Sequence, residues 1–461
     1  MSEFLQTRVA EASAVPLRPD HLFVYDLRAP LRIATRGEGC YLYDAEGRRY
    51  LDGAAGFVVA NLGHGNAEVA EAMAAQARTL ALAPFTVFVT EPALRLAARL
   101  ARYAPGDLNH AVFVSGGSEA VEVAVKLARQ YWVEVGRPSK YKIIGRWQSY
   151  HGNTLGALSI GGNRPRRRPY TPLLLDMPKI PPCYPYRCPP DQPPETWGPR
   201  GADYLEAAIL EAGPETVAAF IAEPVVGATL GAAPAPPGYF QRIREICDRY
   251  DVLFIADEVM TGFGRTGRRF GIEHWEVVPD LMAVAKGISA GYAPLGAVLC
   301  TTRIYEAFRP PRGSGHFVNL FTYGANPLCC AVGDVVLRLT EEWDLAGRAA
   351  RLGAYLRERL RPLEASPIVG DVRGLGLMLG VEFVQNKATK EPFPPEARVA
   401  ARVAEAALAR GLFVYPGTGT VDGERGDHLM IAPPLIIREA ECDELASTLI
   451  AAVDAVAREL A

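Results

Sequence analysis

The chain has 461 residues, of which 49% are hydrophobic and 22% are charged, and its formal net charge is −3. This composition is typical of a globular protein long enough for two or three domains. A near-neutral charge balance provides no general attraction to nucleic acid or acidic membranes. The N-terminal stretch MSEFLQTRVAEASA lacks an apolar signal core, and charges, Pro or Gly interrupt every long apolar stretch. We therefore expect a cytoplasmic protein without a membrane span.

The N-terminal part, residues 1–63, alternates short apolar pieces with turns, and GCYLYDAEGRRYLD predicts strands around a hairpin. From residue 64 to 330, short apolar runs alternate with amphipathic stretches such as EAVEVAVKLARQYW and YFQRIREICDRY. The apolar runs lie at 111–114, 141–144, 217–222, 252–256 and 281–285. This alternation predicts an α/β domain with a mostly parallel sheet flanked by helices.

The stretch 163–201 is rich in Pro and Arg and predicts a long excursion over the surface. Its run RPRRRP is interpreted as solvated arginines rather than as a phosphate clamp. Cys183 and Cys188 in the same stretch are close enough for a metal site or a disulfide, but free thiols in a surface loop are the favoured interpretation. The eight cysteines contain no C-x-x-C pair, so no metal site is expected. Residues 331–461 predict a separate α+β domain, with long helices around GLMLGVEFV.

Polar residues follow several predicted strands, where ligands bind in open α/β sheets. The turn SGGSEA, with Gly117 and Ser118, leads from a strand into a helix, so its free N–H groups favour an anion. Ser118 is equally explained as a plain helix cap. Tyr150 ends the next strand region. Its ring either stacks on a flat ligand ring or simply packs against other side chains. Glu223 follows VAAFIA in the same way.

Lys286 ends the apolar run LMAVA, and only 7 of the 49 basic residues are lysines. A buried lysine is costly unless it is paired or used. Burial and nearby positive charge lower its pKa, which frees the amine to form a Schiff base. An ion pair with Asp257 or Glu258, which follow VLFIA, is the alternative interpretation.

Taken together, an anion-binding turn, an aromatic ring, an aspartate and a lysine at strand ends suit pyridoxal 5'-phosphate. This cofactor has a phosphate, a flat ring, a ring nitrogen that needs a negative partner and an aldehyde that needs an amine. Asp257 would keep the ring nitrogen protonated, and Lys286 would hold the aldehyde as a Schiff base.

The stretch ADEVMTGFGRTG contains a literal G-x-G-x-x-G at Gly262, Gly264 and Gly267. A dinucleotide fingerprint begins directly after its strand, opens a helix and meets an acidic residue at the end of the next strand. Here DEVM intervenes, no convincing helix follows, and Asp280 precedes the next strand. We therefore expect these glycines to let the backbone turn beneath the cofactor.

The stretches AEPVVGA, IADEVMTGFGRTG, PDLMAVAKGISAGYAPLGAV and FTYGANPLCCAV resemble the class III aminotransferases of pyridoxal-phosphate fold type I, from about residue 20 onwards. The resemblance implies a large cofactor-binding domain over 64–330. It also implies a smaller domain built from 1–63 and 331–461. The implied activity is the transfer of an amino group from an amine or ω-amino acid to a keto acid.

The resemblance also implies the site residues. Lys286 forms the Schiff base and shuttles a proton, Asp257 pairs with the ring nitrogen, and Tyr150 and Val259 lie on the two ring faces. The other implied cofactor contacts are Gly117, Ser118, His151, Glu223 and Thr322. Thr322 is expected to reach the phosphate of the partner subunit, which implies a homodimer with shared active sites, alone or within a tetramer.

One departure bears on the substrate. In the ornithine, acetylornithine and γ-aminobutyrate branches an arginine two residues before the APPL-type motif binds the α-carboxylate of glutamate, whereas here Met430 stands there. The loop with Arg425 resembles the ω-amine:pyruvate branch, where a mobile arginine binds a carboxylate and swings out for an apolar amine. Plain loop surface is the alternative for Arg425. Phe57 occupies a place where that branch often carries a tryptophan lining the substrate pocket, next to Tyr150.

Pyruvate is therefore the expected acceptor, and the donor stays open. Two other functions also stay open. One is an aminomutase or a decarboxylase of the same fold. The other is a non-catalytic binding protein, against which the presence of both Lys286 and Asp257 argues.

Overall fold

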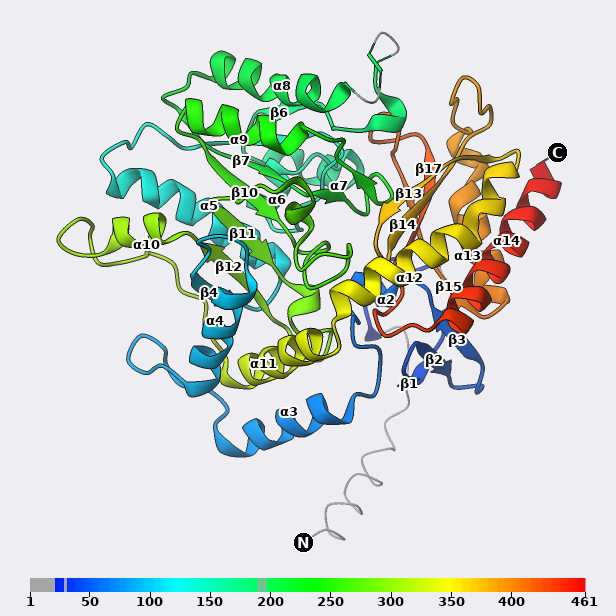
Figure 1. Cartoon of the computed structure of the whole chain (residues 1–461), viewed down its shortest axis with the longest axis horizontal. Helices are drawn as coiled ribbons and strands as arrows, with labels where there is room; N and C mark the ends of the chain where they lie inside the picture. The colour runs from blue at the N-terminus through cyan, green and yellow to red at the C-terminus, as the bar shows by residue number, and fades with distance from the viewer. Residues whose placement is uncertain (1–20, 29–30, 190–191, 194–195, 461) are drawn as a thin grey trace, which may run out of the picture.

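The computed structural model describes residues 21–28, 31–189, 192–193 and 196–460. Within these residues the central sheet has seven strands in the order β4-β12-β11-β10-β7-β5-β6 (Figure 1). They are β4 (His110–Val114), β5 (Lys142–Arg146), β6 (Lys179–Ile180), β7 (Val217–Ala222), β10 (Leu253–Asp257), β11 (Leu281–Val284) and β12 (Gly296–Cys300). All neighbours pair in parallel except β12, which is antiparallel to both β11 and β4. The mostly parallel α/β sheet is as predicted.

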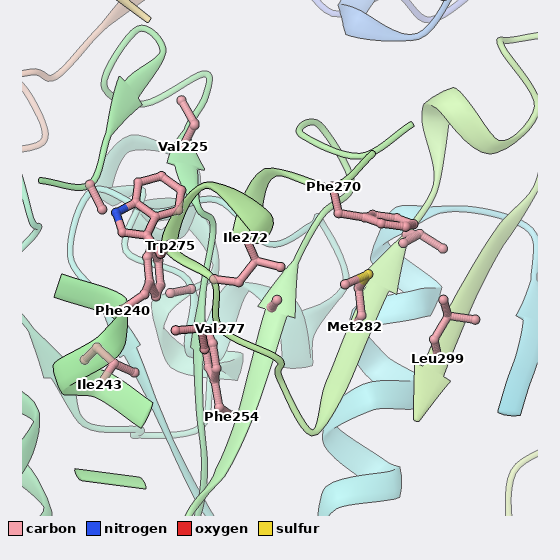
Figure 2. Packing of buried hydrophobic residues seen from close by; sticks show 14 of the residues in the cluster. Val225, Phe240, Ile243, Phe254, Phe270, Ile272, Trp275, Val277, Met282 and Leu299 are labelled. Atoms are coloured by element: carbon pink, nitrogen blue, oxygen red, sulfur yellow. The ribbon is translucent and has the colours of Figure 1, made fainter. Parts of the chain in front are cut away.

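The central strands are apolar throughout because both faces of the sheet are covered. Successive side chains alternate between the faces, so Phe254 packs on one side and Ile255 on the other. Figure 2 shows the first side, where Phe240 of α9 (Tyr239–Arg249) and Trp275 pack over Phe254. On the opposite face lies α5 (Gly117–Glu134), which shares a cluster of buried residues with Ile255.

Further helices surround the sheet (Figure 1). They are α3 (Ala67–Thr79), α4 (Glu91–Tyr103), α6 (Leu155–Ile160), α7 (Arg164–Arg167), α8 (Trp197–Ala212), α10 (Thr302–Phe308) and α11 (Pro327–Glu342). Asn326 caps α11, because its side chain accepts a hydrogen bond from Cys329 N at 3.1 Å. The chain passes along this helix from the central sheet to its C-terminal part.

Two smaller sheets lie beside the central one, each four-stranded within the described residues. One runs β1-β2-β3-β15, and the other β13-β14-β17-β16. Their strands are β1 (Ala34–Glu38), β2 (Tyr41–Asp44), β3 (Arg49–Asp52), β13 (Val369–Leu375), β14 (Met378–Phe383), β15 (Leu412–Phe413), β16 (Tyr415–Thr418) and β17 (Asp427–Ile431). The antiparallel pair β2–β3 is the predicted hairpin.

The N- and C-terminal parts of the chain meet in these sheets. Strand β15 pairs in parallel with β3, and Tyr41 Oη donates a hydrogen bond to Glu444 at 3.0 Å. Helices α12 (Leu345–Leu360), α13 (Val399–Ala409) and α14 (Glu439–Leu460) cover this part (Figure 1). We propose that 1–63 and 331–461 form one small domain, which this pairing supports for the described residues. The boundary at 330 falls inside α11.

The sequence predicted that the stretch 163–201 runs over the surface, but only part of it does. It contains the edge strand β6, and Cys183, Tyr184 and Trp197 in it are buried. Buried contacts with distant residues draw the segment inward, and those contacts leave no local sequence signal. All eight cysteines are free thiols, as expected, although Cys183 does not lie on the surface.

Two glycines of the G-x-G-x-x-G stretch, Gly264 and Gly267, lie close to α12, and a turn beneath the cofactor stays a prediction for the stretch. A Cβ on Gly264 would come within 3.1 Å of Ala346 N, and one on Gly267 within 3.0 Å of Ala350 Cβ. Both glycines have positive φ and let the turn pack against α12. The 3₁₀ turn Gly271–Trp275 follows in place of the helix that a dinucleotide fingerprint requires.

In the part of the chain that the structure describes, no helix has both the length and the apolar character needed to span a bilayer.

Candidate active site

A pocket of about 430 Å³ opens at the carboxyl-terminal edge of the central sheet. Parallel strands bring their ends to one edge, so residues far apart in the sequence meet there. The lining residues that lie at strand ends, in the turns after them or at a helix start are Ser115, Gly116, Gly117, Ser118, Tyr150, His151, Glu223, Asp257, Val259, Ala285 and Lys286. Strand β12 runs the opposite way, so Pro294 and Leu295 before its start line the same pocket.

The turn before α5 can hold an anion. Helix α5 begins at Gly117, and Gly116 before it has no side chain to cap the first N–H groups. A Cβ on Gly117 would lie 2.9 Å from Val259 Cγ1, so glycine keeps this approach open. Ser118 is not the helix cap; its hydroxyl accepts a hydrogen bond from Asn153 N at 3.0 Å.

Asp257 is buried at the end of β10, and 3% of it is exposed. Its Oδ2 lies 2.7 Å from His151 Nδ1, and its Oδ1 accepts a hydrogen bond from Val259 N at 3.1 Å. Burial lowers the pKa of His151, but the carboxylates of Glu223 and Asp257 outweigh it and raise that pKa above its usual value. His151 and Asp257 thus form a buried pair at the pocket.

Glu258 is turned away from the pocket, although it is the next residue. Its carboxylate accepts hydrogen bonds from Gly271 N at 2.8 Å and Ile272 N at 2.7 Å. Burial raises its pKa to about 7. Glu258 therefore fixes the loop after β10, while Asp257 faces the pocket.

Lys286 follows β11 and lines the pocket. Its backbone has φ +50°, which is uncommon for a residue with a side chain and typical of functional sites. Burial, with the positive charges of Arg166 and Arg265, lowers the pKa of Lys286 to about 8, and Asp257 only partly opposes this. Within the described residues Lys286 forms no ion pair, so the alternative of a structural pair with Asp257 or Glu258 is wrong.

Glu223 links two neighbouring strands below the pocket. Its Oε1 accepts a hydrogen bond from Tyr150 N at 2.9 Å, and its Oε2 lies 3.3 Å from Arg146 Nη2. Glu223 thereby holds the backbone of Tyr150, which lines the pocket.

Three predicted site residues do not line this pocket. Phe57 is 62% exposed, and its ring centroid lies 5.6 Å from that of Tyr415. Arg425 Nε lies 2.7 Å from Asp422 Oδ2, and 56% of the Arg425 side chain is exposed. Thr322 is exposed on the loop before α11.

Sequence reasoning missed some residues of the site. Val59 and Gly291 line the pocket without any recognisable local pattern. The guanidinium carbon of Arg166 lies 4.3 Å from the centroid of the Tyr150 ring. The interpretation of RPRRRP as solvated was therefore wrong for Arg166, and also for Arg167, whose Nη1 contacts the carbonyl oxygens of Ser159 and Gly161 at 3.0 Å.

These residues fit pyridoxal phosphate. The uncapped turn at Gly117 suits a phosphate, the pocket lined by Tyr150 and Val259 suits a flat ring, and a buried carboxylate and an amine line the same pocket. Among the described residues no group of His, Cys, Asp and Glu is arranged to hold a metal ion.

Comparison with known proteins gives consistent results. A family model described as aminotransferase class-III matches residues 25–453. The uncharacterized aminotransferase YodT of Bacillus subtilis (strain 168) is 41% identical over 441 residues, covering 95% of this chain and 99% of the relative. A putrescine–pyruvate aminotransferase of Pseudomonas aeruginosa is 38% identical, covering 90% of this chain and 88% of the relative.

Solved structures are similar over nearly the whole chain. An (S)-enantioselective ω-transaminase from Thermomicrobium roseum superposes with a TM-score of 0.87 at 40% identity, covering 98% of each chain. The ω-transaminase of Pseudomonas jessenii in complex with PMP superposes with a TM-score of 0.90 at 31% identity, covering 96% of this chain and 98% of the other.

Proposed function

The chain belongs to the class III aminotransferases, which depend on pyridoxal phosphate, and we propose that it transfers an amino group from an amine or ω-amino acid to pyruvate. One observation carries the proposal: the same pocket is lined by Lys286, Asp257 and the turn at Gly117. The similarity to a putrescine–pyruvate aminotransferase supports pyruvate as acceptor. Met430, where other branches carry a carboxylate-binding arginine, is fully buried in β17, which argues against glutamate as the partner.

When bound, pyridoxal phosphate supplies an aldehyde that carries the amino group and a ring that accepts electrons from the substrate carbon. We assign its phosphate to the N–H groups at Gly117 and Ser118, and its ring to the space between Tyr150 and Val259. The buried carboxylate of Asp257 would hold the proton of the ring nitrogen.

Lys286 would bind the aldehyde and move a proton to and from the substrate carbon. With a pKa of about 8, roughly one tenth of the amine is neutral at pH 7. At an unperturbed pKa of 10.5 the neutral share would be smaller by about 300-fold. The lowered pKa thus supplies the nucleophile and base that the transfer needs.

We also propose that the enzyme is a homodimer, alone or within a tetramer, in which Thr322 completes the partner's site. Large apolar side chains near Thr322 are exposed, a feature typical of interfaces. They are Phe88, Val89, Val318, Leu320 and Tyr323. The two segments lie together, because Asn326 Nδ2 is 3.5 Å from Ala81 O. The free cysteines support the proposed cytoplasmic location, where thiols stay reduced.

Amine donors offered with pyruvate or with 2-oxoglutarate test the reaction. We expect a released carbonyl product, the aminated form of the cofactor after the first half-reaction, and faster turnover with pyruvate. Lys286→Ala should fold but lose turnover by several orders of magnitude, because no neighbour replaces its amine. An isomerised or decarboxylated product without release of a carbonyl compound would instead favour the aminomutase or the decarboxylase.

A further inference from the structure

Helix α7 and the residue after it carry four arginines, and three of them have partners other than pocket-lining residues. Arg164 lies over the ring of Trp147, with 4.7 Å between the guanidinium carbon and the ring centroid. Arg167 contacts carbonyl oxygens at the end of α6, and Arg168 forms an ion pair with Glu424.

The fourth, Arg166, differs from them. It is partly buried, and its guanidinium carbon lies over the ring of Tyr150, a pocket-lining residue. Its backbone N donates to Asn163 Oδ1 at 3.1 Å, but within the described residues its side chain makes neither an ion pair nor a hydrogen bond. A guanidinium has five N–H donors, so the contact with the Tyr150 ring leaves donors of Arg166 for a ligand.

The charge of Arg166 also reaches the reacting group. It is one of two positive charges that lower the pKa of Lys286, after the effect of burial. An anion bound at Arg166 would therefore lie in the electrostatic field of the pocket. A guanidinium edge matches a carboxylate, which accepts two parallel hydrogen bonds.

We propose that Arg166, held over the Tyr150 ring, binds the carboxylate of the substrate and so selects keto acids and ω-amino acids over neutral compounds. The inference rests on the proposed function and names the residue that recognises its acid substrate. Arg425, the residue predicted from the sequence, would first have to leave its ion pair with Asp422. Arg166 requires no such release.

A binding experiment tests this without turnover. Calorimetry on the cofactor-loaded protein would compare propionate with the neutral, similarly shaped propionamide. We expect Arg166→Ala to weaken propionate binding by about ten- to a hundredfold and to leave propionamide within about twofold. Arg166→Lys should retain part of the affinity, because it keeps the charge and loses the fork geometry. Arg164→Ala, two residues away on the same helix, is the matched control and should behave as the wild type.

The second arm measures steady-state kinetics. It uses one uncharged amine donor and compares two acceptors, pyruvate and propanal. Arg166→Ala should raise KM for pyruvate by the same factor and should lower the ratio of kcat/KM for pyruvate to kcat/KM for propanal, because any effect through the pKa of Lys286 acts on both acceptors alike. The proposal is overturned if both acceptors suffer equally, if Arg164→Ala has the same effect, or if only Arg425→Ala raises KM for pyruvate. Because the binding arm needs no turnover, a protein that binds propionate through Arg166 but transfers no amino group would contradict the proposed function alone.

Discussion

Asp257 and Glu258 are adjacent carboxylates with opposite environments. Successive residues at the end of a strand point to opposite sides, so one faces the pocket and the other the loop. Asp257 is paired with His151, whereas Glu258 accepts backbone N–H groups and has a raised pKa. The sequence shows only two neighbouring acidic residues. Their surroundings give Asp257 the chemical role and Glu258 the structural one.

Removing the negative charge of Asp257 should slow catalysis without releasing the cofactor. Asp257→Asn keeps the shape and a hydrogen bond to His151, but it removes the negative charge facing the ring nitrogen. A charge-assisted hydrogen bond contributes about 1.5–3 kcal/mol, so we expect kcat to fall by roughly ten- to a hundredfold or more. Single-turnover kinetics and cofactor titration measure the two effects. Unchanged kinetics would contradict the role given to Asp257.

Attachment of the cofactor should depend on pH through Lys286. Only the neutral amine attacks the aldehyde, and its pKa is about 8. Below pH 8 the rate should rise about tenfold per pH unit, and above it the rate should level off. Stopped-flow absorbance after mixing apoprotein with cofactor records this profile. Arg166→Ala removes a nearby positive charge, so its inflection should move to higher pH. A wild-type inflection near the unperturbed value of 10.5 would contradict the lowered pKa.

At the scale of elements, a buried ion cluster joins the stretch 163–201 to the sheet of β13 and β14. Glu382 of β14 is fully buried between two arginines. Arg187 Nη2 lies 2.7 Å from Glu382 Oε1, and Arg373 Nη2 lies 2.9 Å from Oε2. The hydroxyl of Tyr184 donates a hydrogen bond to the same carboxylate. This cluster fixes the inserted stretch, which also carries α7 and Arg166.

Breaking the cluster should destabilise the protein strongly. Glu382→Gln leaves the largely buried Arg187 without a negative partner and Arg373 with Asp371 alone, which costs about 3–5 kcal/mol. Denaturant unfolding of the cofactor-loaded protein measures the change. Glu459→Gln is the control, because its ion pair with Arg402 is exposed and should contribute less than about 1 kcal/mol. Equal small changes in both variants would contradict the importance of the cluster.

At the scale of the whole molecule, the exposed apolar surface around Leu320 bears on assembly. Leu320→Asp should give a monomer at micromolar concentration that retains its cofactor poorly, because a charge at a buried interface is costly and Thr322 would leave the partner's site. Sedimentation velocity and cofactor absorbance measure both effects. Leu210→Asp, at an equally exposed position on α8, is the control and should stay dimeric. A dimeric Leu320→Asp variant would contradict the proposed interface.

The sequence by itself determined the alternation of strands and helices and the residues that follow the parallel strands. Those are local properties, since apolar runs form buried strands and parallel strands place their ends on one edge. Lys286, Asp257 and Tyr150 could therefore be assigned to one site before their distances were known. The resemblance to class III aminotransferases rested on the same local stretches.

The tertiary structure decided what depends on contacts between distant residues. Strand β12 enters the central sheet antiparallel, and β15 joins the N-terminal hairpin, because buried surfaces rather than local propensity select their neighbours. Arg166 reads as one more arginine in a basic run until the fold lays it over Tyr150. Its environment, and hence its chemistry, comes from a residue in another part of the chain, and no local pattern encodes that contact.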